Sequence, residues 1–269
     1  MEQPSIQQPV VLSINSHDPS GGAGLVADVE TVTSLGCHCL SAITALNVRD
    51  TQNLKDRQST ETALLIEQIR AALEDSAVNV IKVGDIATVA QAEAIHTILV
   101  EYGDIPVVLD PVLHHGAADG DVNLALRMLL LPRTSVTVLS VDHVNQLATS
   151  GDNLGARIQE LLEFGCSNLL VTVACNEGGK LINRLYSHRG VSNEYAWDCL
   201  PQGFHGAGST LSAALAAYLA HGAALPDALQ RAQQFTWQAL AHARRLGMGQ
   251  LIPDRLFWSR RGAIRSRPR

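Results

Sequence analysis

Short apolar runs alternate with stretches of helical spacing along most of this chain. Apolar runs bounded by turn residues predict buried strands, which we expect at residues 9–15, 40–46, 78–83, 105–110, 135–140 and 168–173, with a hairpin over 178–195. Apolar residues spaced as on one face of a helix predict helices at residues 25–36, 60–74, 88–102, 121–130, 153–164, 208–221 and 226–246. The segments between them, among them residues 140–146, are expected to be loops.

The order of these elements predicts an α/β fold. Strands that are apolar throughout, as at residues 105–110 and 168–173, are typical of a mostly parallel sheet with helices on both faces. The chain shows no internal repeat and no linker, so we expect one domain over residues 9–258 and a basic, disordered tail over 259–269. Ligands of such folds bind beyond the carboxyl ends of the strands, which directs the search for a site to those loops.

A turn of small residues, Gly206-Ala-Gly-Ser-Thr210, opens the apolar helix expected at residues 208–221. Glycines let a backbone approach a ligand closely, and the first N–H groups of a helix favour anions. The turn therefore predicts a phosphate site, with Ser209 and Thr210 capping the helix. The alternative is a capped loop that binds nothing.

Composition and charge exclude several classes of protein. The 269 residues contain no run of 18 apolar residues, which predicts no transmembrane helix, and the polar N-terminus lacks the layout of a signal peptide. We therefore expect a cytoplasmic protein without a membrane partner. The net charge is −6, but six arginines follow the last acid, Asp254, at positions 255, 260, 261, 265, 267 and 269. Without them the remaining 14 basic and 26 acidic residues give −12, which argues against nucleic-acid binding; we expect the arginines to form a frayed, solvated end.

The five cysteines are scattered and odd in number. They occupy positions 37, 39, 166, 175 and 199 and form no Cys-x-x-Cys pair. This spacing indicates neither a zinc site nor a disulfide framework, and we expect reduced thiols.

A second glycine-rich loop, Asp18-Pro-Ser-Gly-Gly-Ala-Gly24, follows the first expected strand. It is not a phosphate-binding P-loop, because no Gly-Lys-Ser/Thr follows. Together with His205-Gly-Ala-Gly-Ser-Thr210, however, it resembles the ribokinase superfamily, and within it the hydroxymethylpyrimidine/phosphomethylpyrimidine kinases of thiamine biosynthesis. The resemblance extends from about residue 9 to 253 and includes Gly36-Cys-His38, Ile43-Thr-Ala-Leu46, Lys82-Val-Gly84, Leu109-Asp-Pro-Val112 and Asn183-Arg-Leu-Tyr-Ser187.

The resemblance implies a three-layer ribokinase-like fold, ATP as phosphate donor, Mg²⁺, a small pyrimidine substrate and a homodimer. It also assigns roles. Gly206, Ala207 and Gly208 would form the anion hole for the transferred phosphoryl group, with Ser209 at the catalytic position that follows. The other assignments are Asp18, Gly22, Gly24, Asp28, Arg49 and Asp85 for the ring; Lys82, Asp110, His205 and Thr210 for phosphate or nucleotide; and Asp110, Asp142 and Asn145 for the metal.

Three of these residues also have a plain structural interpretation. Asp28 could be a solvated carboxylate on a helix, Lys82 a surface charge near a strand end, and Asp110 the cap of a turn before Pro111.

This chain departs from the family pattern at positions that carry its chemistry. Ser209 stands where the family has Cys, or Asp in the wider superfamily, as the group that takes the substrate's proton. Asn145 replaces the Glu of Thr-Pro-Asn-x-x-Glu, which supports the metal, although Asp142 could restore charge. Thr172-Val-Ala-Cys175 stands where Gly-Gly-His follows the strand.

Two further departures lie in the expected ring pocket. Arg49 replaces a Gln that reads the ring edge, and Asp85 replaces a Met. The new pair could form a salt bridge that closes the pocket, or it could read a different ring. The sequence therefore supports two hypotheses: a working kinase with altered catalytic groups, or a degenerate paralogue that binds a pyrimidine or nucleotide as a sensor or partner protein.

Overall fold

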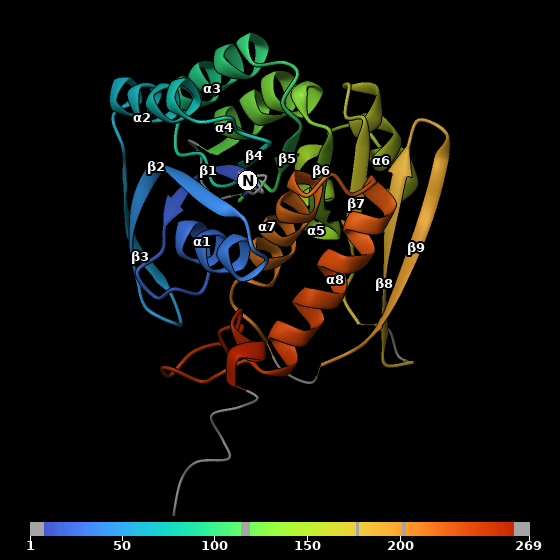
Figure 1. Ribbon diagram of the computed structural model, residues 1–269. Helices are drawn as coiled ribbons and strands as arrows, with labels where there is room; N and C mark the ends of the chain where they lie inside the picture. The colour runs from blue at the N-terminus through green and yellow to red at the C-terminus, as the bar shows by residue number, and fades with distance from the viewer. Residues whose placement is uncertain (1–7, 114–118, 176–177, 201–202, 261–269) are drawn as a thin grey trace, which may run out of the picture.

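The computed structural model describes residues 8–113, 119–175, 178–200 and 203–260. In these residues nine strands form one sheet in the order β3-β2-β1-β4-β5-β6-β7-β8-β9 (Figure 1). Their bounds are β1 (Val10–His17), β2 (His38–Arg49), β3 (Leu54–Ser59), β4 (Val80–Val83), β5 (Val107–Leu109), β6 (Val136–Ser140), β7 (Asn168–Thr172), β8 (Lys180–Ser187) and β9 (Gly190–Asp198).

The centre of the sheet is parallel and its two edges are antiparallel. β2, β1, β4, β5, β6 and β7 pair in parallel, whereas β3 runs against β2, and the β8–β9 hairpin runs against β7. The predicted mostly parallel α/β sheet is confirmed.

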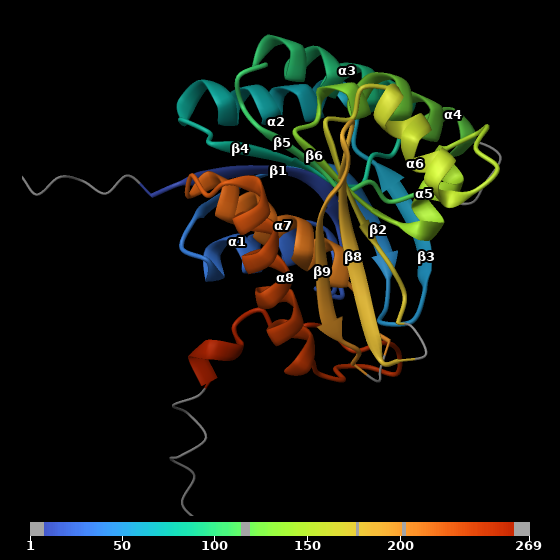
Figure 2. The same cartoon turned by 90° about the vertical axis from the view of Figure 1, so that its right-hand side faces the viewer.

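Helices cover both faces of this sheet (Figure 2). One face carries α2 (Thr62–Asp75), α3 (Val89–Glu101), α4 (Asp119–Ala125), α5 (Val141–Leu147) and α6 (Leu154–Glu163), and the other carries α1 (Gly24–Ser34), α7 (Ala207–Ala220) and α8 (Leu225–Ala241). Three short elements complete the fold: the π-helix η1 (Leu126–Leu130) and the 3₁₀ turns η2 (Leu131–Arg133) and η3 (Phe257–Arg260).

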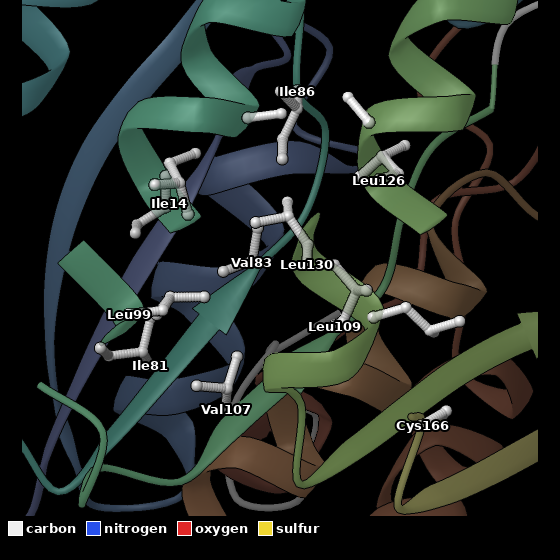
Figure 3. Packing of buried hydrophobic residues seen from close by; sticks show 14 of the residues in the cluster. Ile14, Ile81, Val83, Ile86, Leu99, Val107, Leu109, Leu126, Leu130 and Cys166 are labelled. Atoms are coloured by element: carbon white, nitrogen blue, oxygen red, sulfur yellow. The ribbon is translucent and has the colours of Figure 1, made fainter. Parts of the chain in front are cut away.

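Each face of the sheet has its own hydrophobic core. Ile81, Val83 and Leu109 point from the central strands toward Leu99 of α3 and Leu130 of η1 (Figure 3). The opposite face buries the small side chains of α7, which lets that helix lie close against the strands. The two cores hold the carboxyl ends of β1, β4 and β5 side by side, at the point where the strand order reverses, which is the usual place for a ligand.

Three local predictions were incomplete. β3, Leu54-Lys-Asp-Arg-Gln-Ser59, was not predicted, because an exposed edge strand with polar side chains lacks the apolar signal. Residues 140–146, expected as a loop, mostly form α5, whose first turn is capped by the Ser140 hydroxyl accepting from the His143 N–H. The helix expected at 121–130 is α4 followed by the π-helix η1.

Two predictions about single residues are wrong. Cys175 and Cys199, expected as free thiols, form a disulfide, because the β8–β9 hairpin returns the chain to the end of β7. Arg255, expected in a solvated tail, is 1% exposed. The remaining tail from residue 261 lies outside the described residues. No helix in the described ranges is both long and apolar enough to cross a membrane.

Candidate active site

The two glycine-rich turns predicted from the sequence pack directly against each other. Gly206 has φ +94°, and a Cβ at this position would lie 1.6 Å from the Gly22 carbonyl oxygen. A Cβ on Gly22 would in turn lie 2.0 Å from Cδ2 of His205. Both positions therefore require glycine, since any side chain would force the two turns apart.

The turn at Gly206 leaves the start of α7 uncapped. Gly206 is the N-cap residue, and no described side chain accepts a hydrogen bond from the first turn. The prediction that Ser209 and Thr210 cap the helix is wrong: both lie inside it, and the Thr210 hydroxyl donates to the Gly206 carbonyl over 2.8 Å. The N–H groups of Ala207, Gly208 and Ser209 make no hydrogen bond to any residue described in the structure. They remain available to an anion such as the predicted phosphate.

A cavity of about 120 Å³, here called the ring-side cavity, lies between the loop after β1, strand β2 and the start of α7. It brings together seven of the predicted site residues: Asp18, Gly24, Arg49, Asp85, Asp110, His205 and Ser209. Segments far apart in the sequence thus line one cavity, with Ser209 facing it from the turn at residues 206–210, here called the anion turn.

Asp18 is the most heavily bonded side chain of this cavity. Its Oδ2 lies 2.6 Å from Nε2 of His205, and its Oδ1 accepts from the N–H and the hydroxyl of Ser20. Burial raises the pKa of Asp18, but the hydrogen bonds from His205 and Ser20 outweigh burial and hold it at about 2. His205, assigned to phosphate or nucleotide, instead orders the loop at residues 18–24, here called the ring-side loop, through its bond to Asp18.

Of the two alternatives for Arg49 and Asp85, the salt bridge between them does not form. Asp85 pairs with Arg57 of β3 at 2.6 Å, whereas Nε of Arg49 lies 3.8 Å from Asp18 and donates to the carbonyl oxygen of Asp50. Arg49 lines the ring-side cavity, and neither of its terminal nitrogens is hydrogen-bonded to a described residue. Arg57 was missed because it belongs to the unpredicted edge strand.

Asp28 and Lys82 lie beneath the ring-side cavity and do not line it. Nζ of Lys82 lies 2.8 Å and 2.9 Å from the two carboxylate oxygens of Asp28, and both side chains are 1% exposed or less. Ser13 and Asn15 also donate to Asp28. The assignment of Asp28 to the border of the pocket is therefore wrong, as are the solvated alternatives for both residues.

Asp110 lies at the end of β5, between the ring-side cavity and the start of α7. Its Oδ2 accepts from the Ser212 hydroxyl at 2.7 Å, and its Oδ1 lies 3.8 Å from the place where a Cβ on Gly208 would stand. Burial raises the pKa of Asp110, while the charge of Lys82 and the Ser212 hydrogen bond lower it; the net direction is upward. The alternative interpretation of Asp110, as the cap of a turn before Pro111, does not account for the position of its carboxylate beside the anion turn.

The other residues assigned to the metal lie on α5. Asp142 is exposed. Oδ1 of Asn145 accepts from Nη1 of Arg157 at 2.6 Å, so the amide oxygen assigned to the metal already has a hydrogen-bond partner. Within the described residues no group of three or more His, Cys, Asp or Glu side chains could hold a metal. Of the three residues assigned to the metal, Asp110 is therefore the one whose carboxylate lies at the anion turn.

A second cavity of about 230 Å³, here called the hairpin cavity, lies between β7, the β8–β9 hairpin, α7 and α8. Trp197 and Trp237 line it, and Gln233 Oε1 accepts hydrogen bonds from Trp197 Nε1 and Asn183 Nδ2. Flat, mostly apolar walls with a few fixed polar groups suit a planar ring. The sequence did not single out these tryptophans, because they lie 40 positions apart on a hairpin and a helix.

The two cavities meet at the start of α7. Ala207 and Gly208 line the hairpin cavity, and Ser209 lines the ring-side cavity. The free N–H groups of these three residues therefore lie between two spaces, each of which could hold one reactant of a group transfer.

The chain is similar to known proteins over most of its length. The family model described as phosphomethylpyrimidine kinase matches residues 18–254. A hydroxymethylpyrimidine/phosphomethylpyrimidine kinase of Escherichia coli K12 is 33% identical over 254 residues, covering 88% of this chain and 93% of its own length. That of Mycobacterium tuberculosis H37Rv is 32% identical over 269 residues, covering 91% and 93%. The chain also matches the thiamine biosynthesis bifunctional protein ThiED of Geobacter sulfurreducens at 30% identity over 89% of this chain, and spans half of that protein's length.

Solved structures share the fold. The ADP complex of Bacillus subtilis pyridoxal kinase has a TM-score of 0.85 at 24% identity, covering 94% of this chain and 99% of its own. A phosphomethylpyrimidine kinase of Clostridium difficile has a TM-score of 0.73 at 22% identity, covering 86% and 100%. At these identities the likeness establishes the ribokinase-like fold that the sequence predicted.

Proposed function

This chain belongs to the phosphomethylpyrimidine kinase family, and from that premise we propose that it phosphorylates hydroxymethylpyrimidine or its monophosphate with ATP, a reaction of thiamine biosynthesis. One observation carries the proposal: two cavities of different character meet at the uncapped start of α7. A phosphoryl group held there is within reach of a donor on one side and an acceptor on the other.

Each reactant has a place in this arrangement. The base of ATP would lie in the hairpin cavity against Trp197 and Trp237, and the pyrimidine in the ring-side cavity near Arg49. The N–H groups of Ala207, Gly208 and Ser209 would bind the transferred phosphoryl group at the positive end of the α7 dipole. Phosphoryl transfer relies on positioning and charge stabilisation, which this geometry can supply.

Asp110 fits the Mg²⁺ that the family implies. Mg²⁺ is usually held by one or two carboxylates, substrate phosphates and water, so a single carboxylate at the anion turn is sufficient on the protein side. Bound there, the ion would neutralise charge on the phosphates. Asp142 and Asn145 would act only through water, and Asn145 is already engaged by Arg157.

Ser209 is the reason to keep a second candidate function. A hydroxyl at this position can orient the substrate alcohol but is a poor base near neutral pH. A protein that binds pyrimidine or nucleotide without turnover, as a sensor or partner protein, would retain the same cavities and lack the transfer.

Assembly and location are also part of the proposal. We propose a homodimer, supported by Leu46, Val48 and Leu54, which expose large apolar side chains on the antiparallel β2–β3 edge. A kinase of a vitamin pathway that consumes ATP is expected in the cytoplasm.

The test is ADP formation with MgATP and either hydroxymethylpyrimidine or its phosphate. The kinase proposal predicts product with at least one of them, and none from Gly206→Val, which would fill the contact with the Gly22 carbonyl. Ligand binding by titration calorimetry without any ADP formation would instead support the second candidate. Absence of both binding and turnover would contradict the placement of the site.

A further inference from the structure

One buried guanidinium contacts both glycine-rich turns of the site. The side chain of Arg255, which lies between α8 and η3, is fully buried. Its Nη1 donates to the Gly21 carbonyl at 3.0 Å, and its Nη2 donates to the Gly22 carbonyl. Its Nε donates to the Thr210 hydroxyl at 2.9 Å. The loop after β1 and the first turn of α7 are thus joined by a single side chain.

The contact on α7 leads directly to the anion turn. The Thr210 hydroxyl that accepts from Arg255 donates to the carbonyl of Gly206, so the guanidinium is linked to the N-cap residue through one hydroxyl. Nη2 of Arg255 also lies 2.9 Å from the place where a Cβ on Gly206 would stand. Arg255 therefore fills the space directly behind the junction of Gly22 and Gly206.

The chemistry of the contact requires arginine. Four of the five N–H donors of a guanidinium are used here: one at Nε, two at Nη1 and one at Nη2. Glu30 of α1 supplies the counter-charge at 3.0 Å from Nη1. A lysine has three donors on one nitrogen and cannot reach acceptors on three sides of a plane. A buried charge without such partners would be strongly unfavourable.

We propose that Arg255 is a positioning residue that sets the distance between the ring-side loop and the anion turn. This inference rests on the proposed kinase function, since the loop would hold the pyrimidine and the turn the phosphoryl group. Both turns carry glycines and few side chains of their own, so the guanidinium supplies a fixed point behind them, in addition to the bond between His205 and Asp18. A displacement on the order of 1 Å between acceptor and phosphoryl group is enough to slow transfer about 100-fold.

The test compares Arg255→Met with Ser34→Ala. Methionine fills the space but donates no hydrogen bond. Ser34 is the matched control, because its hydroxyl donates to the Arg255 backbone carbonyl and accepts from Trp258, so its loss loosens the same segment without touching either glycine turn. We expect Arg255→Met to lower kcat about 10- to 100-fold with a KM for MgATP within about twofold of wild type. Ser34→Ala should lower the melting temperature and leave kcat unchanged.

Amide hydrogen exchange gives a readout that does not depend on turnover. In Arg255→Met, residues 18–24 and 205–210 should both exchange faster, whereas in Ser34→Ala the increase should be confined to the C-terminal segment. If Arg255→Met does not fold, Thr210→Val removes the Nε acceptor at nearly equal volume and should give a smaller effect in the same direction. A folded Arg255→Met with unchanged kcat and unchanged exchange in both turns would overturn the proposal. If the wild type shows no turnover, the kinase function fails, and the exchange comparison still decides whether Arg255 positions the two turns.

Discussion

Nε2 of His205 lies 2.6 Å from Oδ2 of Asp18, although 187 positions separate the two residues in the chain. The bond joins the residue before the anion turn to the first residue of the ring-side loop. With the two hydrogen bonds from Ser20 it keeps the Asp18 carboxylate ionised in a place where burial alone would favour the neutral form.

Asp18 should therefore contribute a pH-dependent part of the stability. Its pKa of about 2 lies below the ordinary 3.8, so its contribution is fully present above pH 3.8 and is lost as the pH falls toward 2. The size of the shift corresponds to about 2 kcal/mol. Asp18→Asn should lower the free energy of unfolding by about that amount at pH 7. Urea denaturation of both proteins between pH 7 and pH 2 checks this. A difference between them that does not shrink below pH 4 would contradict the assignment.

The buried pair of Lys82 and Asp28 should behave as one unit. Lys82→Met leaves the Asp28 charge buried without its cation and should cost about 3–5 kcal/mol of stability. Adding Asp28→Asn removes that charge but keeps an oxygen that can accept from Ser13 and Asn15. We expect the double variant to be more stable than Lys82→Met alone, as measured by urea denaturation. Strictly additive losses in the double-mutant cycle would show that the two side chains do not interact.

The disulfide between Cys175 and Cys199 should stabilise the β8–β9 hairpin, which lines the hairpin cavity. The bond closes a loop of 24 positions, for which the loss of chain entropy in the unfolded state predicts about 3 kcal/mol. The variant Cys175→Ser/Cys199→Ser should lose about that much stability, measured by thermal unfolding. Dithiothreitol should lower the wild-type midpoint to that of the variant and leave the variant unchanged. Equal sensitivity of both proteins to dithiothreitol would mean that the bond does not contribute.

Features encoded in short stretches were predictable from the sequence. The apolar runs of β5, β6 and β7 and the spacing in α2, α3 and α8 are local signals, and the structure has these elements where they were expected. The two glycine-rich turns were also recognisable, because positions where only glycine fits must be glycine in the sequence. β3 carries no such signal, since an edge strand exposed to solvent is polar on both faces.

Partners brought together by the fold were not predictable. Arg255 follows the last acid of the chain in a run of arginines, and nothing nearby indicates burial; its acceptors are Gly21, Gly22, Glu30 and Thr210, from three distant segments. The same holds for Asp85, whose partner Arg57 belongs to the unpredicted strand. Charge pairing depends on which strands become neighbours, and that is a property of the whole sheet.

Arg49 should determine which ring the protein prefers. A guanidinium has only donors, so it favours a ligand with acceptors or negative charge, such as a phosphorylated ring. Arg49→Gln should shift the ratio of dissociation constants toward neutral hydroxymethylpyrimidine, by roughly tenfold for one charge-assisted hydrogen bond. Titration calorimetry with hydroxymethylpyrimidine and its phosphate measures this ratio. Asp50→Asn is the control, because the hydrogen bond that the structure describes between Arg49 and Asp50 uses the Asp50 backbone carbonyl and not its side chain. An unchanged ratio in Arg49→Gln would exclude Arg49 as the residue that reads the ring.

Ser209 decides between a kinase that works by positioning and a binder without turnover. The residue lines the ring-side cavity at the uncapped start of α7, where a thiol would be partly ionised by the free N–H groups and the helix dipole. In a working kinase, Ser209→Cys should raise kcat by roughly tenfold or more, because a thiolate can take the proton of the substrate alcohol and a serine hydroxyl cannot. The kcat of Ser209→Cys should rise as the pH passes through the pKa of the new thiol, whereas the kcat of the wild type should show no such rise.

Three variants assayed for ADP formation make the decision. Ser209→Ala controls for the loss of the orienting hydroxyl and should be slower than wild type. Robust wild-type turnover that Ser209→Cys does not raise would show that this serine is not a weakened catalytic position. Turnover only in the triple variant Arg49→Gln/Asn145→Glu/Ser209→Cys would identify a former kinase. In that case the free N–H groups at the start of α7 still bind an anion, but the positions for the ring, the metal and the substrate's proton have changed together. The wild-type protein then binds its ligands without transferring a phosphoryl group between them.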